Sequence, residues 1–245
     1  WNWKANGAGS ANTDGSINST VSANATAGFS IIKYTGNGTG NSTIGHGLGA
    51  TPKFIIVKNL TTAQSWGTKS DSFVSAGDPR VLYLNATASY ANDTNVWGTS
   101  AVFNNSTFTV GDWNGSNQSG SSFIAYCFAQ KTGYSKFGSY IGNDLADGTF
   151  VYTGFKPAFV MLKKSSQTSD WLICDSKRNT SNVVNKKLFP NTSGTEDSYD
   201  VSDFVSNGFK IRTTSGSINA SGQTYIYMAF GQSLVGSNNV PCTAR

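Results

Sequence analysis

Phe123-Ile124-Ala125-Tyr126-Cys127-Phe128-Ala129-Gln130 is the most apolar stretch of this 245-residue chain, and it returns as Tyr225-Ile226-Tyr227-Met228-Ala229-Phe230-Gly231-Gln232. Aromatic and β-branched residues fit a pleated, packed surface better than they fit a helix. The runs Phe54–Val57 and Phe123–Phe128 are continuously apolar, which predicts central strands that are covered on both faces. The sequence therefore predicts a β-fold in which one central strand occurs twice.

Other blocks of sequence repeat in the same order around these two strands. The matching pairs are Tyr34–Asn37 with Tyr140–Asn143, Pro52–Lys58 with Pro157–Lys163, Trp66 with Trp171, Leu84–Thr87 with Pro190–Ser193, and Phe108–Val110 with Phe209–Ile211. Because chance does not keep such blocks collinear, we infer a tandem duplication. The predicted organisation is an N-terminal strand and linker (1–27) that continues an upstream domain, repeat 1 (28–132), repeat 2 (133–232) and a polar C-terminal tail (233–245).

The residue composition argues against helices. Gly, Ser, Thr and Asn dominate the chain, and Glu196 is its single glutamate. Those four residue types disfavour helix interiors through backbone entropy or through competing side-chain hydrogen bonds. Disorder is also disfavoured, because only 13% of the residues are charged and 13% are aromatic. The composition therefore predicts an ordered, turn-rich, all-β fold.

Seven strands are predicted in each repeat. Clusters of Gly, Asn, Ser and Thr separate the apolar segments and supply the turns. In the first repeat the expected strands lie near 29–36, 42–47, 53–59, 65–70, 81–85, 102–111 and 122–130. Short strands at this spacing are typical of sandwiches and jelly rolls. The predicted fold class is all-β, with two tandem β-sandwich (jelly-roll-like) domains of about 105 residues each.

Charge, hydropathy and cysteine content exclude several classes of protein. The net charge of +5 comes from scattered lysines without an arginine cluster, so no nucleic-acid partner is expected. The longest apolar run is far shorter than the roughly 20 residues that cross a bilayer, so no membrane insertion is expected. Cys127, Cys174 and Cys242 are too few for a disulfide framework.

Candidate catalytic residues are few. His46 is the single histidine and lies in a glycine-rich turn, where a structural role is favoured over that of a general base. Its counterpart in the second repeat is Tyr152 or Thr153. Glycoside hydrolysis would need two carboxylates that flank a cleft, whereas acids such as Asp144 and Asp147 stand in turn contexts. We therefore predict a protein without catalytic residues and keep glycoside hydrolysis as a minor alternative.

An acidic stretch near residue 200 is the one weak candidate for a metal site. Asp197, Asp200 and Asp203 would offer oxygen ligands to a hard cation. The stretch lacks the glycine-bearing spacing of a calcium loop, and a solvated loop is the preferred interpretation. We expect neither a metal nor a cofactor.

Tryptophan residues suggest a weak sugar-binding hypothesis, because aromatic faces pack on the apolar faces of sugars. Trp66 and Trp171 occupy equivalent positions in the repeat, which favours a shared core role for this pair. Trp97 and Trp113 lie in more polar, unpaired surroundings. They are the better candidates for stacking on a sugar.

Asn-x-Ser/Thr sequons are unusually frequent, and the chain contains 14 of them. Two interpretations stay open at this point. The sequons mark N-glycosylation of a secreted protein, at positions such as Asn24, Asn85 and Asn114. Alternatively, they are turn sequences that are reused in every loop. The turn interpretation is preferred.

Several long strings resemble one protein family. They are Ser10–Ile17, Ala27–Ile31, Gly45–Gly49 with Pro52-Lys53, Ala125–Ala129, Gly133–Tyr140, Asp147–Phe159, Asp175–Arg178 and Tyr225–Phe230. Together these strings resemble a β-rich module of bacteriophage tail-fibre and virion structural proteins, over nearly the whole chain from about residue 10 to 232. The polar tail and the number of sequons depart from that family's pattern.

The resemblance implies a non-catalytic virion structural protein, of tail-fibre or capsid and tail decoration type, that displays loops for attachment to a host surface. The partners it implies are other virion proteins, further copies of the chain (a trimer is the expected oligomer) and a glycan or protein on the host. The location it implies is the virion surface or the extracellular space. The alternative is a secreted or cell-surface N-glycosylated structural or filament protein, and a carbohydrate-binding module ranks below both.

Overall fold

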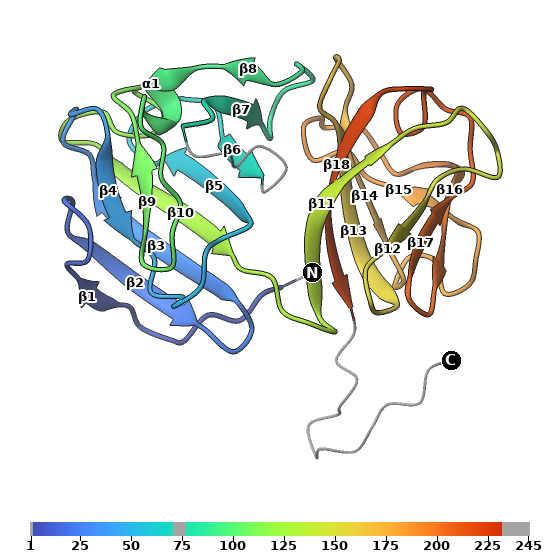
Figure 1. The fold of residues 1–245 in the computed structure, drawn as a ribbon, viewed down its shortest axis with the longest axis horizontal. Helices are drawn as coiled ribbons and strands as arrows, with labels where there is room; N and C mark the ends of the chain where they lie inside the picture. Colours follow the sequence, from blue (N-terminus) through green and yellow to red (C-terminus); the bar gives the residue numbers. More distant parts are fainter. Residues whose placement is uncertain (1, 71–76, 232–245) are drawn as a thin grey trace. The chain divides into compact units, whose positions relative to one another are not determined.

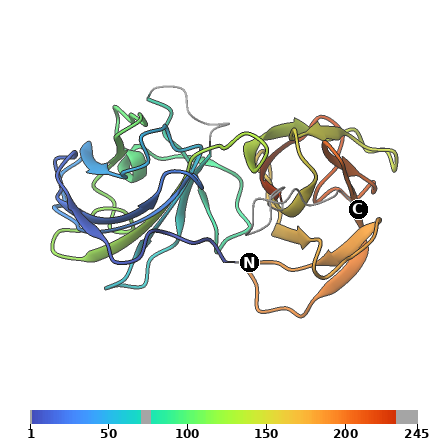
Figure 2. The same cartoon turned by 90° about the horizontal axis from the view of Figure 1, so that it is seen from below.

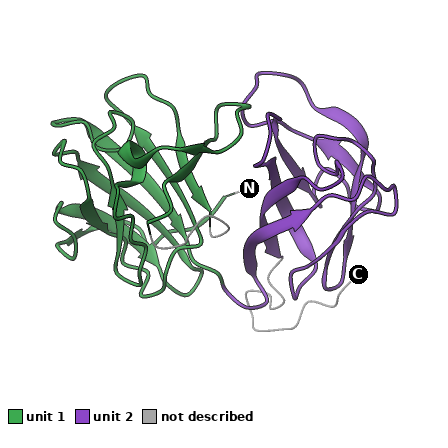
Figure 3. Ribbon diagram, turned by 45° about the horizontal axis from the view of Figure 1, so that its top comes forward, with its two compact units in different colours: residues 1–130 green, residues 131–245 purple. Residues whose placement is uncertain are grey.

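The computed structural model describes residues 2–70 and 77–231, and it divides the chain into two compact units, 1–130 and 131–245 (Figure 3). Both units are built from antiparallel strands (Figure 1). A single short helix, α1 (Thr94–Trp97), occurs in the described part of the chain. The predicted all-β fold class is therefore confirmed.

Unit 1 contains an eight-stranded sheet with the order β1-β2-β3-β10-β5-β6-β7-β8. These strands are β1 (Ser10–Asn12), β2 (Ser19–Asn24), β3 (Phe29–Thr35), β10 (Ser122–Phe128), β5 (Phe54–Asn59), β6 (Gly67–Ser70), β7 (Arg80–Tyr83) and β8 (Ala91–Asn92). Strands β1, β2 and β3 lie side by side in both views (Figures 1 and 2). The last strand, β10, pairs with β3 on one side and with β5 on the other.

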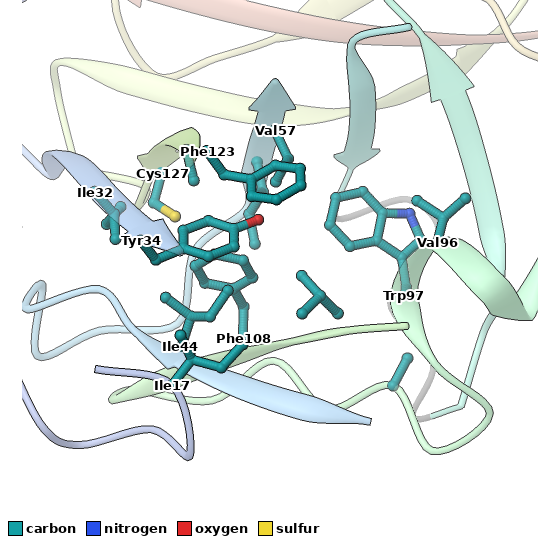
Figure 4. Close-up of a cluster of buried hydrophobic side chains, with 14 of the residues drawn as sticks. Ile17, Ile32, Tyr34, Ile44, Val57, Val96, Trp97, Phe108, Phe123 and Cys127 are labelled. Carbon is teal, nitrogen blue, oxygen red and sulfur yellow. The ribbon is translucent and has the colours of Figure 1, made fainter. Parts of the chain in front are cut away.

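A smaller layer covers one face of this sheet. It consists of β4 (Ser42–Gly45) paired with β9 (Thr107–Val110), together with α1. Side chains from both layers form one core, in which Tyr34 and Phe123 of the large sheet lie close to Ile44 and Phe108 (Figure 4). Alternating inward positions on the strands of each layer supply this core.

Unit 2 is a sandwich of two four-stranded sheets. The first sheet has the order β11 (Ser135–Ile141), β18 (Thr224–Gly231), β13 (Pro157–Lys164) and β14 (Trp171–Asp175). The second has the order β12 (Phe150–Tyr152), β17 (Gly208–Ile211), β16 (Asp197–Val205) and β15 (Val184–Lys187). Their facing side chains, among them Tyr140, Leu162 and Phe209, form the second core.

The two units share one strand framework. The order β3-β10-β5-β6 in unit 1 corresponds to β11-β18-β13-β14 in unit 2, and the pair β4-β9 corresponds to β12-β17. Registers agree as well: Ile44 pairs with Phe108 as Val151 pairs with Phe209. Strands β1 and β2 belong to the sheet of unit 1, although the sequence predicts that residues 1–27 are a strand and a linker outside the repeat. They have no counterpart among the described strands of unit 2.

Candidate functional site

Asn117 fastens two loops of unit 1 to each other. Its side chain is fully buried just before β10. The side-chain amide donates hydrogen bonds to the carbonyl oxygens of Thr39 and Gly111, both at 2.9 Å, and the side-chain oxygen accepts one from the backbone N–H of Asn37 at 2.9 Å. Because a buried amide is costly to leave unsatisfied, these bonds fix the loop after β3 against the loop before β10.

Asn219 does the same in unit 2, where it is also fully buried. Its amide donates to the carbonyl oxygens of Leu145 at 2.9 Å and Thr213 at 2.7 Å. Its side-chain oxygen accepts from the backbone N–H of Asn143 at 3.1 Å. The loop after β11 and the loop before β18 are therefore joined as in unit 1.

In each unit a buried tyrosine binds the residue that precedes the asparagine. The hydroxyl of Tyr34 donates to the carbonyl of Ser116 at 2.6 Å, and the hydroxyl of Tyr140 donates to the carbonyl of Ile218 at 2.8 Å. Each acceptor directly precedes the buried asparagine in the chain. Burial raises the pKa of both phenols well above the ordinary value, so both hydroxyls stay protonated and act as donors.

Glycine is required where the paired loops cross. A Cβ atom added to Gly36 would lie 2.3 Å from the carbonyl oxygen of Gln118, and one added to Gly142 would lie 2.3 Å from that of Ala220. Real Cβ atoms do not approach a carbonyl so closely, so each glycine permits a direct backbone contact. The loops at this end of each unit are thus fixed by backbone packing as well as by asparagine.

The exposed groups on these fixed loops differ between the two units. The loop after β3 presents neutral residues from Asn37 to Asn41, and all of them are exposed. The corresponding loop of unit 2 presents Asp147, whose carboxylate accepts from Lys210 Nζ at 2.8 Å and from Arg212 Nη1 at 2.6 Å. These cations hold the pKa of Asp147 below its usual value. One framework therefore carries two surfaces of different chemistry.

His46 is a buried turn residue, as its glycine-rich surroundings predict. Its Nε2 lies 3.1 Å from the carbonyl oxygen of Asn104, and its Nδ1 accepts from the backbone N–H of Leu48 at 3.2 Å. In unit 2 the buried Thr153 takes this place, and its hydroxyl oxygen accepts from the backbone N–H of Phe155. Both nitrogens of His46 are therefore engaged in holding its turn, and burial lowers the pKa of the ring.

Residues 1–233 match the family model described as "Domain of unknown function (DUF7483)". The chain belongs to the DUF7483 family. No match was found among the curated proteins or among the solved structures. In the described part of this DUF7483 chain, no helix has the length and apolar character needed to span a membrane.

Trp97 does not offer a surface for stacking on a sugar in this DUF7483 chain. Its ring is fully buried in the core of unit 1, beside Val96 (Figure 4). It also lies edge-on to the ring of Phe103. The polar residues around it cap a short helix, because Asp93 accepts from the backbone N–H of Asn95, and the helix turns its apolar residues inward. The sugar-stacking prediction is therefore wrong for Trp97.

Trp113 is half-buried and packs on the same core. Its ring lies against Gly115 and 5.6 Å from the ring of Tyr83. Its role as a ligand contact stays a prediction. Trp66 and Trp171, the predicted core pair, differ in burial: Trp171 is fully buried, whereas Trp66 is half-buried. Their backbones are nevertheless equivalent, because the N–H of each donates to a corresponding asparagine oxygen at 2.9 Å.

The acidic stretch of this DUF7483 chain is a strand, β16, and the preferred loop interpretation is wrong. Asp197 pairs with Lys187 at 2.8 Å, and Asp203 pairs with Arg212 at 2.5 Å. The candidate metal ligands are Asp197, Asp200 and Asp203. Two of them, Asp197 and Asp203, are thus bound by separate cations. Among the described residues, no three or more His, Cys, Asp or Glu side chains gather as a metal site would require.

The three named sequons differ in their accessibility. Asn85 and Asn114 are exposed, whereas Asn24 is half-buried and its amide donates to the carbonyl oxygen of Lys4. Three other sequon asparagines are buried: Asn59, Asn117 and Asn219. In this family member at least part of the sequon excess therefore serves folding.

The buried positions of Asn117 and Asn219 could not be predicted from the sequence. Their signal is the block Asn117-Gln118-Ser119-Gly120, which recurs before the last strand of unit 2 as Asn219-Ala220-Ser221-Gly222. The block reads as turn sequence, because Asn, Ser and Gly favour turns wherever they occur. Only the fold shows that its asparagine points inward.

Proposed function

We propose that this DUF7483 chain is a non-catalytic structural protein of a virus particle, exposed on the virion surface, that displays loops for attachment to a host. The observation that carries the proposal is the shared role of Asn117 and Asn219, which fix loops of different surface chemistry on one framework. Loops that are fixed before binding lose little entropy when they bind, which suits a recognition surface.

Polar groups that would otherwise suggest catalysis already have partners within the chain. His46 holds its own turn, and Asp147 and Asp203 are paired with arginine. The sequence resemblance to bacteriophage tail-fibre and virion structural modules supports the location. The proposed partners are other virion proteins, further copies of the chain in a trimer, and a glycan or protein of the host surface.

Particles test the proposed location. Virions from the source of this sequence would be purified and treated with an antibody raised against the chain. We expect the antibody to label a surface appendage in electron micrographs, and we expect mass spectrometry to detect the chain in the particles. Absence of the chain from purified virions would overturn the proposal.

Binding to host cells tests the role of the loops. The purified chain should bind host cells and slow adsorption of the virus, and lysines at exposed loop positions should weaken both effects. Suitable changes are Thr39→Lys in unit 1 and Ala146→Lys in unit 2. Matched controls are Thr26→Lys and Ser206→Lys, which are exposed in turns at the opposite ends of β3 and β17. Equal effects of loop and control variants would contradict the proposal.

A further inference from the structure

In unit 1 the chain covers the edges of its own two layers with one segment. Strand β2 pairs with β3 through six residues, from Ser19 opposite Tyr34 to Asn24 opposite Phe29. The preceding residue Ile17 forms a parallel bridge with Ile44 of β4. The segment 15–24 therefore closes one side of the sandwich across both layers.

The contact with β4 is close and specific. The backbone N–H of Ile17 donates to the carbonyl oxygen of Thr43 at 3.0 Å, and Ser16 and Thr43 exchange two hydrogen bonds between side chain and backbone at 2.9 Å. A Cβ atom on Gly15 would lie 2.3 Å from the Thr43 carbonyl oxygen. The side chains of Ile17 and Val21 are buried in the core.

In unit 2 no described strand pairs with the corresponding side of the sandwich, where the Thr149 hydroxyl donates to the carbonyl oxygen of Ile141 at 2.7 Å and the Lys136 ammonium lies 5.2 Å from the centre of the Tyr152 ring. Strand β11, the counterpart of β3, is the outermost strand of its sheet, and β12, the counterpart of β4, is the outermost strand of the other. Half of the backbone N–H and C=O groups of an edge strand point away from the sheet and offer a template for a further strand. The chain thus has two equivalent edges and, in its described part, one segment that covers such an edge.

At this edge, unit 2 carries larger apolar side chains than unit 1 does at the equivalent positions. A surface that meets only water would be expected to carry polar side chains. Aligned through their strand partners, Thr35, Thr43 and Gly45 of unit 1 correspond to Ile141, Phe150 and Tyr152 of unit 2. These three apolar side chains are 52%, 44% and 58% exposed, and Leu145 between them in sequence is 58% exposed. Native edges are usually protected by charge, and exposed apolar groups that lie together mark interaction sites.

We propose that the edge formed by Gly138–Ile141 of β11 and by β12 binds an extended strand of another protein, antiparallel to β11. The segment 15–24 gives the chemistry of that strand, because it occupies the equivalent edge in unit 1. The partner strand carries aliphatic residues with the spacing of Ile17 and Val21, separated by small polar residues. Main-chain hydrogen bonds supply the affinity, and the aliphatic side chains and the exposed apolar residues of the edge supply the specificity.

A peptide with the sequence of residues 14–26 is the probe for this edge. We expect the labelled peptide to bind the full chain in fluorescence anisotropy, and we expect hydrogen exchange to show slower exchange of the β11 and β12 amides in the complex. Ile141→Lys and Tyr152→Lys should each weaken binding by about tenfold or more, because the lysines place charge at the edge. Leu60→Lys is the matched control, since Leu60 is 56% exposed in unit 1. A peptide with Ile17→Asp and Val21→Asp should not bind.

Two outcomes overturn the proposal. One is that the edge does not bind the peptide, seen as no binding up to about 1 mM or as binding that Ile141→Lys leaves unchanged, in which case the apolar side chains only shield their own edge. The other is association of the chain with itself through this edge, seen as a mass in light scattering that rises with concentration and falls to that of a monomer in Ile141→Lys. In that case the occupant is a second copy of the chain. The test does not depend on where the protein is located.

Discussion

Asn117 and Asn219 make equivalent hydrogen bonds in the two units: each donates to two backbone carbonyls and accepts from the backbone N–H of another asparagine. Both side chains are fully buried. No aliphatic side chain replaces three such bonds, so replacing either asparagine leaves several backbone groups of its loops without their partner. This relationship makes the two units internal controls for each other.

Asn117→Ala should lower the free energy of unfolding of unit 1 by about 2–4 kcal/mol, because several buried backbone groups lose their partners at once. Asn219→Ala should do the same to unit 2. Denaturant unfolding, followed by hydrogen exchange to assign each unit, measures the change. The exposed Asn114→Ala is the control and should change stability by less than about 0.5 kcal/mol. An equally small effect of Asn117→Ala would show that the loops hold without it.

His46→Thr should remove the dependence of stability on pH between about 7.5 and 5.5. Burial lowers the pKa of His46 in the folded chain, so the unfolded chain takes up a proton first as the pH falls. The stability contributed by neutral His46 is therefore complete above the unfolded pKa of about 6.5 and is lost as the pH falls below that value. His46 is the single histidine.

Thr at position 46 copies the residue that unit 2 uses at the equivalent place, Thr153, so the variant keeps an acceptor for the N–H of residue 48. Thermal unfolding of both proteins across this pH range makes the comparison. A wild-type stability that does not fall with acid in this range would contradict the assignment of His46 as a buried neutral side chain.

Cys127 and Cys174 should not react with a thiol reagent at pH 8 in the folded chain. Burial raises the pKa of the Cys127 thiol, and it raises that of Cys174 to about 12, so almost no thiolate is present. Absorbance after addition of the reagent should report two thiols only in denaturant. Cys242, which lies outside the described residues, is replaced by Ser to keep the count clear. Rapid native labelling of either cysteine would place that thiol at the surface.

If the chain is secreted through a glycosylating pathway, glycans should appear at exposed sequons such as Asn85 and Asn114 and be absent from Asn59, Asn117 and Asn219. A buried asparagine that binds backbone groups cannot also carry a sugar in the folded chain. Peptide mapping by mass spectrometry measures the occupancy of each site. Full occupancy at Asn117 in a folded protein would contradict the described loop arrangement.

The central strands could be predicted because their residues are informative one by one. The apolar runs of β5, β10, β13 and β18 are of strand length and must be buried, which predicts central strands of a packed sheet. The repetition of these runs in the sequence aligns the two units. The core strand β18 is buried from Tyr225 to Gly231, whereas β10 alternates, with Ile124 and Tyr126 only half-buried. Coverage on both faces, which the sequence predicts for Phe54–Val57 of β5 and for β10, is therefore overstated at Ile56, Ile124 and Tyr126.

Other features could not be predicted because their burial is decided by distant parts of the chain. Polar neighbours suggest an exposed Trp97, yet a four-residue helix turns that ring into the core. Likewise, the charges of Asp197 and Asp203 suggest a loop, but Lys187 of β15 and Arg212, which directly follows β17, pair with them beside the strands of a sheet. Neither partner is adjacent in sequence, so no local pattern reveals the pairing.

The placement of the final strand has a consequence for how the protein is made. In each unit the last strand lies between two earlier ones: β10 between β3 and β5, and β18 between β11 and β13. During synthesis, the two strands that flank the last strand of a unit therefore leave the ribosome before the strand that pairs with both of them has been made. Unit 1 completes its sheet only after Phe128 has emerged, while a message that stops before Thr224 leaves unit 2 without its centre and exposes the flanking strands to aggregation.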